Sequence, residues 1–593
     1  MTIRGVLDEP LGESVAGRFA LKNDKRDGYV TNVVNGKDMG RRNVSIFRGS
    51  LRYKSGNVDA VLTAEYDRAR NGSPIVVAGD LPGEAEFVPA GWRGMYTSPC
   101  LPAGTRCKAP DTYYSAHDGG VSGDLRDQSD MDTYRVGLSL TVKDTAIGDV
   151  TAITGYKKFN LFEYTDQDGT PAMLIDTRRQ TRAWQFSQEL RTDFSLGDAV
   201  DVTVGGFYLT DHCDHYQHLR IDFAGGATYN LTNNTYTKGF TGLFQRNLQD
   251  QDNHSLSAFA QAYFQATDRL RLQAGVRFSH EKTSMLASTL TSSAAGGVTT
   301  FDGTDPAGVP NGLIGNVAPP LGTKSWDNVG WKIGADYKLT DDAMLYGYWA
   351  RGFKSGGFTG RIGIPQDLGP YDPEKVDTFE VGFKTDFFDR RVRWNVSAFT
   401  TSYRGMQLAQ IYFIGSGAGL VQGNTILNAA KARIRGFEAE LTVAPAEGLL
   451  LNASLAHLDA KYSQFDYLLP SGSTTSLAGK RLQNAPKWAA TLGGSYEFPL
   501  GGELSGRLGV NYSYTSEKLL TSIIDTPRAR VQPQHLVNGN FDIKLSERYS
   551  IGVWATNLFD NRYINSVFDA PGTLGLVNYA PPRMFGGSIK AEF

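Results

Sequence analysis

The chain has 593 residues, of which 60 are Lys or Arg and 62 are Asp or Glu, so its formal net charge is -2. These charges are spread along the chain, which excludes the basic footprint of a nucleic-acid-binding protein and a polybasic membrane anchor. Glycine accounts for 67 residues and aromatic residues for 11% of the chain. This composition is typical of a β-rich protein.

The cysteine content is low, with three cysteines in the whole chain, which excludes a disulfide-rich scaffold and a cysteine-rich zinc module. Cys100 and Cys107 flank the segment LPAGTR. A short disulfide between them would fit an oxidising envelope compartment, and two unpaired thiols are the alternative. No window approaches the ~20 apolar residues of a transmembrane helix, and the first ten residues, MTIRGVLDEP, lack the regions of a secretory signal.

Apolar and polar residues alternate with a period of two in many segments, which predicts β-strands with one apolar and one polar face. The pattern is clear at 134–143, 270–279, 379–384 and 508–514. Such strands fit a soluble sandwich whose apolar faces turn inward, or a transmembrane barrel whose apolar faces meet lipid around a polar lumen. In the barrel, the polar lumen face would include Arg135, Lys143, Arg271, Arg277, Lys384 and Asn511.

The lengths of the connections distinguish these two architectures. Tight polar connections recur at 8–13, 55–57, 144–149, 196–199, 267–269, 340–343, 388–391, 444–448, 500–503 and 546–549. The connections that alternate with them are long polar excursions, for example 69–129, 212–253, 281–325 and 564–582. Short turns on one side and long loops on the other are typical of outer-membrane barrels. The predicted fold is therefore all-β, a transmembrane antiparallel β-barrel of about 21 strands.

The two ends of the chain carry further information. The first predicted strand, Thr2–Asp8, precedes a short turn and so begins on the side of the long loops. A single-chain bacterial barrel has an even number of strands, so we expect one N-terminal strand to be missing. The last ten residues, MFGGSIKAEF, alternate and end on Phe593. A terminal lipid-facing strand ending in Phe593 looks like the assembly signal for outer-membrane insertion.

Four segments resemble those of the TonB-dependent outer-membrane receptors, the 22-stranded transporters with a plugged lumen. Asn557–Tyr563 reads NLFDNRY and is similar to the family's NLFD-x-x-Y segment. Arg435–Glu440 (RGFEAE) is similar to the family's G-x-E-x-E strand. Asn484–Trp488 (NAPKW) and Ala350–Phe358 (ARGFKSGGF) resemble its Asn-x-Pro and G-F-K segments. Their order and spacing make the match strong, and the barrel pattern extends it over essentially the whole chain.

The resemblance implies that residues 1–593 form the barrel of an iron-complex or siderophore receptor, with the plug domain, the TonB box and the signal peptide missing from this sequence. It implies energised uptake of a scarce ligand, most often a ferric siderophore, across the outer membrane of a Gram-negative bacterium. The implied partners are outer-membrane lipid, the ligand and the TonB energy-transducing complex, and the protein would be a monomer. We expect no cofactor, no nucleic acid and no enzymatic activity. The alternatives are a plugless remnant acting as a passive pore, a non-functional fragment, and an outer-membrane rim enzyme.

One polar segment, Asp211–His218 (DHCDHYQH), is a candidate metal site. It places His212, Cys213, His215 and His218 within seven residues, and these are ligand types for zinc, copper or haem iron. If the preceding strand continues, His212 and His218 share one face with Asp214, while Cys213 and His215 take the other. A single strand then cannot present all four ligands to one metal. The alternative to a metal or haem site is a polar strand end leading into a loop.

Overall fold

The computed structural model describes residues 1–32, 36–72, 75, 77–78, 114–115, 128–166, 175–221, 228–230, 235–237, 243–293, 313–316, 321–361, 365–414, 421–468, 474–520, 529–570 and 574–592. Its main sheet contains 22 strands, including the four-residue strand β17 (Leu313–Asn316). The other 21 are long and antiparallel, and each pairs with the next long strand along the chain. The predicted number of barrel strands is confirmed.

The long strands alternate in direction through the whole chain. The first ten are β1 (Thr2–Pro10), β2 (Val15–Arg26), β5 (Arg42–Ser55), β6 (Val58–Asn71), β9 (Gln128–Thr145), β10 (Gly148–Asp166), β11 (Ile175–Leu196), β12 (Val200–Ile221), β15 (Leu243–Gln265) and β16 (Leu270–Ser293). The other eleven are β18 (Leu321–Thr340), β19 (Ala343–Lys354), β20 (Glu374–Phe387), β21 (Val392–Ile414), β22 (Val421–Ala446), β23 (Leu449–Gln464), β26 (Trp488–Gly501), β27 (Leu504–Thr515), β30 (Gln534–Lys544), β31 (Tyr549–Thr556) and β34 (Met584–Ala591).

Short elements occupy the long connections. They are β3 (Val30–Asn32), β4 (Asp38–Met39), β7 (Val77–Ala78), β8 (Tyr114–Ser115), β13 (Thr228–Asn230), β14 (Thr235–Thr237), the 3-10 helix η2 (Pro365–Leu368), β24 (Asp466–Leu468), β25 (Thr474–Ser476), β28 (Lys518–Leu519), β29 (Arg530–Val531), β32 (Ile564–Ala570) and β33 (Leu574–Tyr579). Within the described ranges, no helix has the length and apolar character needed to cross a membrane.

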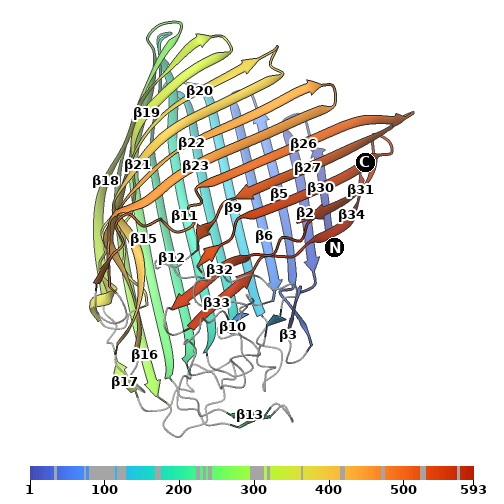
Figure 1. The fold of residues 1–593 in the computed structure, drawn as a ribbon. Helices are drawn as coiled ribbons and strands as arrows, with labels where there is room; N and C mark the ends of the chain where they lie inside the picture. The colour runs from blue at the N-terminus through green and yellow to red at the C-terminus, as the bar shows by residue number, and fades with distance from the viewer. Residues whose placement is uncertain are drawn as a thin grey trace.

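Connection length separates the two ends of the sheet, as predicted. The ten short hairpins lie at one end, and the long connections with their short strands lie at the other (Figure 1). The hairpins are tight: in the β22–β23 turn, Gly448 has φ +75° and an added Cβ would lie 2.2 Å from the Glu497 carbonyl oxygen. Only glycine fits there without strain.

The long strands extend farther than the sequence pattern suggested. The excursions expected at 212–253 and 281–325 lie partly in strands, because β12 continues to Ile221, β15 begins at Leu243, β16 continues to Ser293 and β18 begins at Leu321. These ends lack the apolar alternation by which a strand is recognised, yet their backbone pairing continues in register. The polar ends therefore rise as a continuous wall beyond the apolar band.

Side chains alternate between the two faces of the sheet. On β9, Tyr134, Val136 and Leu138 are 40% to 46% exposed, whereas Thr133 on the opposite face is 1% exposed. The same face of other strands also carries exposed apolar residues, such as Phe278, Phe379 and Val510. An exposed apolar surface of this extent is unusual for a water-soluble monomer and suits contact with hydrocarbon. We call it the outward face, and the opposite one the inner face.

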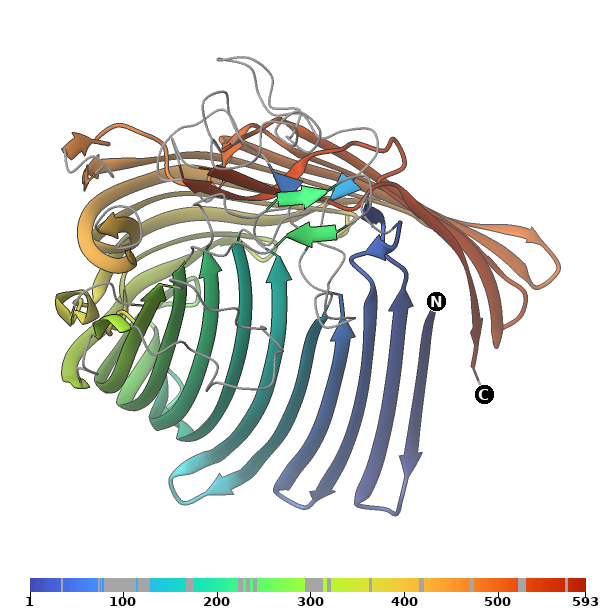
Figure 2. The ribbon, with the colours of Figure 1, turned by 90° about the horizontal axis from the view of Figure 1, so that it is seen from below.

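The sheet curves around an interior and leaves a gap between its two edges, as Figure 2 shows from below. Strands β1 and β34 form these edges, and no pairing joins them in the part of the chain that the structure describes. Arg26 at the end of β2 nevertheless reaches Met584 at the start of β34, with 4.0 Å between Nη1 and Sδ. The edges thus approach each other at the loop end. That a further strand completes the sheet stays a prediction.

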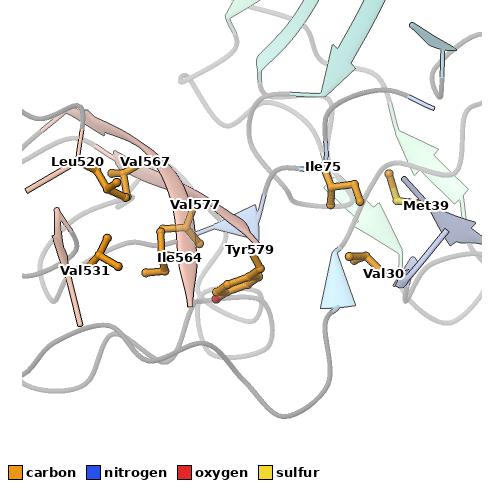
Figure 3. Close-up of a cluster of buried hydrophobic side chains, with 9 residues drawn as sticks. All are labelled: Val30, Met39, Ile75, Leu520, Val531, Ile564, Val567, Val577 and Tyr579. Atoms are coloured by element: carbon orange, nitrogen blue, oxygen red, sulfur yellow. The ribbon is translucent and has the colours of Figure 1, made fainter. Parts of the chain in front are cut away.

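A hydrophobic cluster joins the first and last loops across this gap (Figure 3). Val30, Met39 and Ile75 come from the N-terminal loops, and the C-terminal loops contribute six more residues: Leu520, Val531, Ile564, Val567, Val577 and Tyr579. Strand β33 pairs with β7, and Asn578 Nδ2 donates a hydrogen bond of 2.7 Å to the Ile75 carbonyl. Loop packing therefore connects the two ends of the sheet where strand pairing does not.

We predict that Ile564→Ala destabilises the protein by about 2–5 kcal/mol, because Ile564 is 3% exposed within this cluster and its loss leaves a cavity. The measurement is the melting temperature of the detergent-solubilised protein. Leu11→Ala is the control, since Leu11 is 63% exposed in the turn between β1 and β2. Equal melting temperatures for the two variants would contradict a stabilising role of the loop cluster.

Candidate functional site

The inner face is a wall of paired charges, as the sequence predicted for the lumen. Arg135 pairs with Glu65 and Asp67 on the neighbouring strand β6. Arg271 Nη2 lies 2.7 Å from Asp336 Oδ2. The other predicted lumen residues lie on the same face by strand register: Lys143, Arg277, Lys384 and Asn511. Such a wall suits a hydrated interior and polar solutes.

An arginine of this wall and an arginine of the adjoining loop influence each other electrostatically at the loop end. Arg179 of β11 lies on the inner face, with Nη1 3.3 Å from Glu163 Oε1 of β10. Burial and, in addition, the charge of Arg179 lower the pKa of Arg361, between β19 and η2, to about 10. His215 Nδ1 lies 2.8 Å from Thr181 Oγ1 nearby, and burial together with Arg179 lowers the pKa of His215. The positive charge of Arg179, which also pairs with Glu163, thus acts on Arg361 at this end of the wall, and such a positive region favours an anionic ligand nearby.

Local packing holds the Arg361 segment against the wall. Phe358 and Trp326 belong to a buried cluster, with ring centroids 6.2 Å apart. Thr359 donates its backbone N–H to the Leu368 carbonyl at 2.7 Å, and its hydroxyl accepts the Ile426 N–H at 3.2 Å. A Cβ at Gly360 would lie 2.3 Å from the side chain of Gln249. Arg361 is therefore positioned by a well-packed loop.

Sequence reasoning did not identify Arg179 and Arg361 as a pair. Arg361 follows closely on the segment ARGFKSGGF, but no spacing connects it with Arg179, which lies in a different strand far earlier in the chain. Only the fold brings them together.

The segment Asp211–His218 lies entirely within β12, so its residues alternate between faces. His212 points outward among carboxylates. Its Nδ1 is 3.0 Å from Asp252 Oδ1, and its Nε2 is 3.4 Å from Asp214 Oδ2. One potential ligand atom from each of His212, Asp214 and Asp250 lies within 4.8 Å of the others. A divalent cation could be held there, because imidazole and carboxylate are common ligands of zinc.

The structure does not bring together the four residues predicted as one metal site. Cys213 and His215 turn to the inner face, opposite His212. His218 points outward and contacts Tyr216, and burial, followed by the charges of Arg246 and Arg178, lowers the pKa of His218 to about 4. His212 and His218 thus lie on one face of β12 and Cys213 and His215 on the other, as the period-two alternation of strand side chains predicts. The contribution of Asp250 and Asp252 from β15 was missed, although their alternation in the run QDQDN is a visible signal.

Two other predictions fall on positions outside the described residues. These are the disulfide between Cys100 and Cys107 and the assembly signal at Phe593. Both stay predictions. On the described part of β34, Phe585 and Ile589 are 79% and 86% exposed, as expected for an outward-facing edge strand.

Comparisons with known proteins identify relatives. Residues 48–558 match the family model described as TonB dependent receptor-like, beta-barrel. The pesticin receptor of Yersinia pestis is 25% identical over 317 residues, which cover 52% of this chain and 39% of that protein. The metal-pseudopaline receptor of Pseudomonas aeruginosa strain UCBPP-PA14 is 27% identical over 245 residues, 41% of this chain and 31% of that protein. The match thus spans less than half the length of these relatives.

The solved structures agree in fold. The ferric yersiniabactin uptake receptor from Yersinia pestis superposes with a TM-score of 0.73 at 18% identity, covering 100% of this chain and 78% of the receptor. The relatives are named as receptors, in agreement with the expectation that the protein is not an enzyme. The family model matches most of the sequence, and the described residues form the large antiparallel sheet expected of a β-barrel domain. The chain therefore belongs to the family of TonB-dependent receptors and comprises their β-barrel.

Proposed function

We propose that this protein takes up a ferric siderophore across the outer membrane of a Gram-negative bacterium, with energy supplied by the TonB complex. Family membership and the receptor names of the relatives support uptake. The observation that supports the ligand class is the positive region at the loop end made by Arg179 of the inner face and Arg361 of the adjoining loop. A ferric chelate with anionic oxygen donors is the chemistry that two partly buried guanidinium groups favour.

The rest of the molecule is consistent with this role. The apolar outward face suits contact with lipid, and the polar inner face offers hydrogen-bonding groups to a hydrated ligand. The loop end, where the arginines lie, would face the outside of the cell, since long loops of such barrels are extracellular and the short turns periplasmic. We propose that the protein acts as a monomer, with outer-membrane lipid around the barrel.

We predict that the double variant Arg179→Gln/Arg361→Gln binds the anionic iron(III) tris-catecholate complex about tenfold or more weakly, since charge-assisted hydrogen bonds contribute about 1.5–3 kcal/mol each. The measurement is binding of the radiolabelled complex to the purified protein, followed by its uptake in iron-limited cells that express the protein. Lys143→Gln is the control, because Lys143 shares the inner face but lies beside a short turn.

Equal affinities of the wild type and the double variant for this complex would contradict the assignment of the two arginines. A protein that binds no iron complex and instead conducts ions steadily in planar bilayers would support the passive pore. Both results can be obtained with one protein preparation.

We also propose that the predicted metal site exists with a different set of ligands, namely His212, Asp214 and Asp250 on the outward face. Asp214 and Asp250 are directly opposite each other in the β12–β15 register, and like charges in that position repel. A cation between them relieves this repulsion. Histidine with two carboxylates suits zinc, while the thiol of Cys213 lies on the other face and does not take part.

For this site we expect His212→Ala to reduce zinc affinity about tenfold or more, because it removes the nitrogen ligand. His215→Ala and His218→Ala are matched controls, and their affinity should equal that of the wild type. Isothermal titration with Zn²⁺ in detergent measures all four proteins. A loss of affinity in His215→Ala equal to that in His212→Ala would reject the outward ligand set.

A further inference from the structure

Two cations of the inner face, Arg277 of β16 and Lys332 of β18, lie close together without a carboxylate partner. Lys332 is directly opposite Gly275, two residues before Arg277, so the two cations are diagonal neighbours. Such neighbours in a sheet are about 7–8 Å apart. Neither cation forms an ion pair in the part of the chain that the structure describes. Their mutual repulsion is therefore not compensated by the wall itself.

Both cations lie at the depth of the apolar band. On β16, the outward residues Val276 and Phe278 flank Arg277 and are 51% and 47% exposed. On β18, the outward residue Ile333 follows Lys332 and is 50% exposed. From Arg277, β16 continues to Ser293 at the loop end. The two cations thus face the interior well below the loop end.

A packed socket holds the guanidinium group of Arg277. Its carbon lies 5.3 Å from the ring centroid of Phe207 and 5.8 Å from that of Phe259. Arg277 Nη2 donates to Ser257 Oγ at 3.1 Å, and Nε donates to Ser279 Oγ at 3.4 Å. The two serine hydroxyls are 2.8 Å apart, and both serines are buried. Two rings and two hydroxyls therefore fix the position of the charge without neutralising it.

Glycine residues shape the wall on both sides of Arg277. A Cβ at Gly205 would lie 2.5 Å from Phe259 Cζ, so this glycine makes room for the ring of the socket. On the other side, the partner of Arg277 on β18 is Gly330. The next strand, β19, carries Gly352, where an added Cβ would have open space within 4 Å. Arg277 therefore borders a bare part of the inner face, which we call the inner recess.

Lys332 bounds the inner recess on the turn side. Its Nζ lies 4.4 Å from the ring centroid of Tyr348. The hydroxyl of Tyr348 donates to Glu380 Oε2 at 2.9 Å, and that of Tyr346 donates to Glu380 Oε1 at 2.8 Å. The Glu380 carboxylate is thus held by two phenol groups, whereas Lys332 is held by an aromatic ring. Its charge stays available to an anion in the interior.

We propose that the inner recess is a second binding site for the ferric chelate, where anionic oxygens of the ligand contact Arg277 and Lys332. The inference rests on the proposed function, because it concerns the same ligand. A guanidinium group has five N–H donors, and the two serines accept from only two of its nitrogens, so donors are left for an anion. An anion between the two cations also removes their repulsion.

The spacing of the two cations favours a chelate over an acidic side chain. A tris-catecholate complex presents several anionic oxygens around one iron, so it can contact both cations at once. The single carboxylate of a polypeptide segment in the interior would neutralise only one of them. A site at this depth gives a ligand that leaves the loop end a place to bind before it reaches the turn end.

The test is equilibrium dialysis of the whole chain in detergent against the radiolabelled iron(III) tris-catecholate complex. We expect the wild type to bind two complexes per chain, the tighter one at the loop end. Arg277→Gln/Lys332→Gln should keep only the tighter site, and Arg179→Gln/Arg361→Gln only the weaker one. Gly352→Leu should weaken binding at the inner recess about tenfold, because it fills the recess and removes no charge.

Matched controls remove or retain charge on the same face. Lys143→Gln/Lys157→Gln removes two inner-face cations on β9 and β10 and should still bind two complexes. Arg277→Lys retains the charge and should also bind two. One complex per wild-type chain, or two per chain of Arg277→Gln/Lys332→Gln, would overturn the proposal. If Arg277→Gln/Lys332→Gln changes only the melting temperature, the cations serve a polypeptide segment in the interior and the ligand site is refuted.

The outcome is separable from that of the proposed function. A wild-type protein that binds no iron complex would refute the ferric chelate as the ligand. A single complex that is lost in Arg179→Gln/Arg361→Gln and kept in Arg277→Gln/Lys332→Gln would refute the inner recess alone.

Discussion

Backbone hydrogen bonding in hydrocarbon is the constraint on which the rest of this structure depends. A backbone N–H or C=O in lipid has no water to pair with, so each strand must lie beside another along its whole apolar length. The 21 long strands meet this demand in order, each with its successor in the sequence. Sequential pairing needs only short hairpins at one end, and this leaves the other end free for long loops. The edge strands β1 and β34 have the greatest need of a further hydrogen-bonding partner, because each pairs with another long strand on one side only among the described residues.

Loop packing connects the two ends of the sheet, where no strand pairing joins β1 and β34 among the described residues. The cluster around Val30, Ile564 and Val577 packs N-terminal and C-terminal loops together, and β33 pairs with β7. Residues hundreds of positions apart thereby close the loop end of the molecule, while the hairpin end has no comparable core among the described residues. Stability in this protein thus has two sources: a wall stabilised by hydrogen bonds and a loop core stabilised by apolar burial.

The two faces of one wall carry different chemistry, because neighbouring residues point in opposite directions. On β12, His212 points outward among carboxylates, whereas His215 lies on the inner face near Arg179. The same alternation places Arg351 against Asp377 on the outside and the hydroxyl of Tyr348 against Glu380 on the inside. Ligand capture and contact with the membrane can therefore be built into the same strands without sharing a residue.

The sequence by itself determined the architecture. Period-two alternation, with tight turns such as 55–57 and 500–503 separated by long excursions, predicts the strand number and the two faces, because both are local properties of the chain. It also predicted that Cys213 and His215 lie opposite His212. Only the tertiary structure decided which strands extend past the apolar band and which residues meet across strands. Arg179 and Arg361, His212 and Asp250, and Arg351 and Asp377 come together through register and loop packing, which depend on interactions between segments distant in sequence and leave no local pattern.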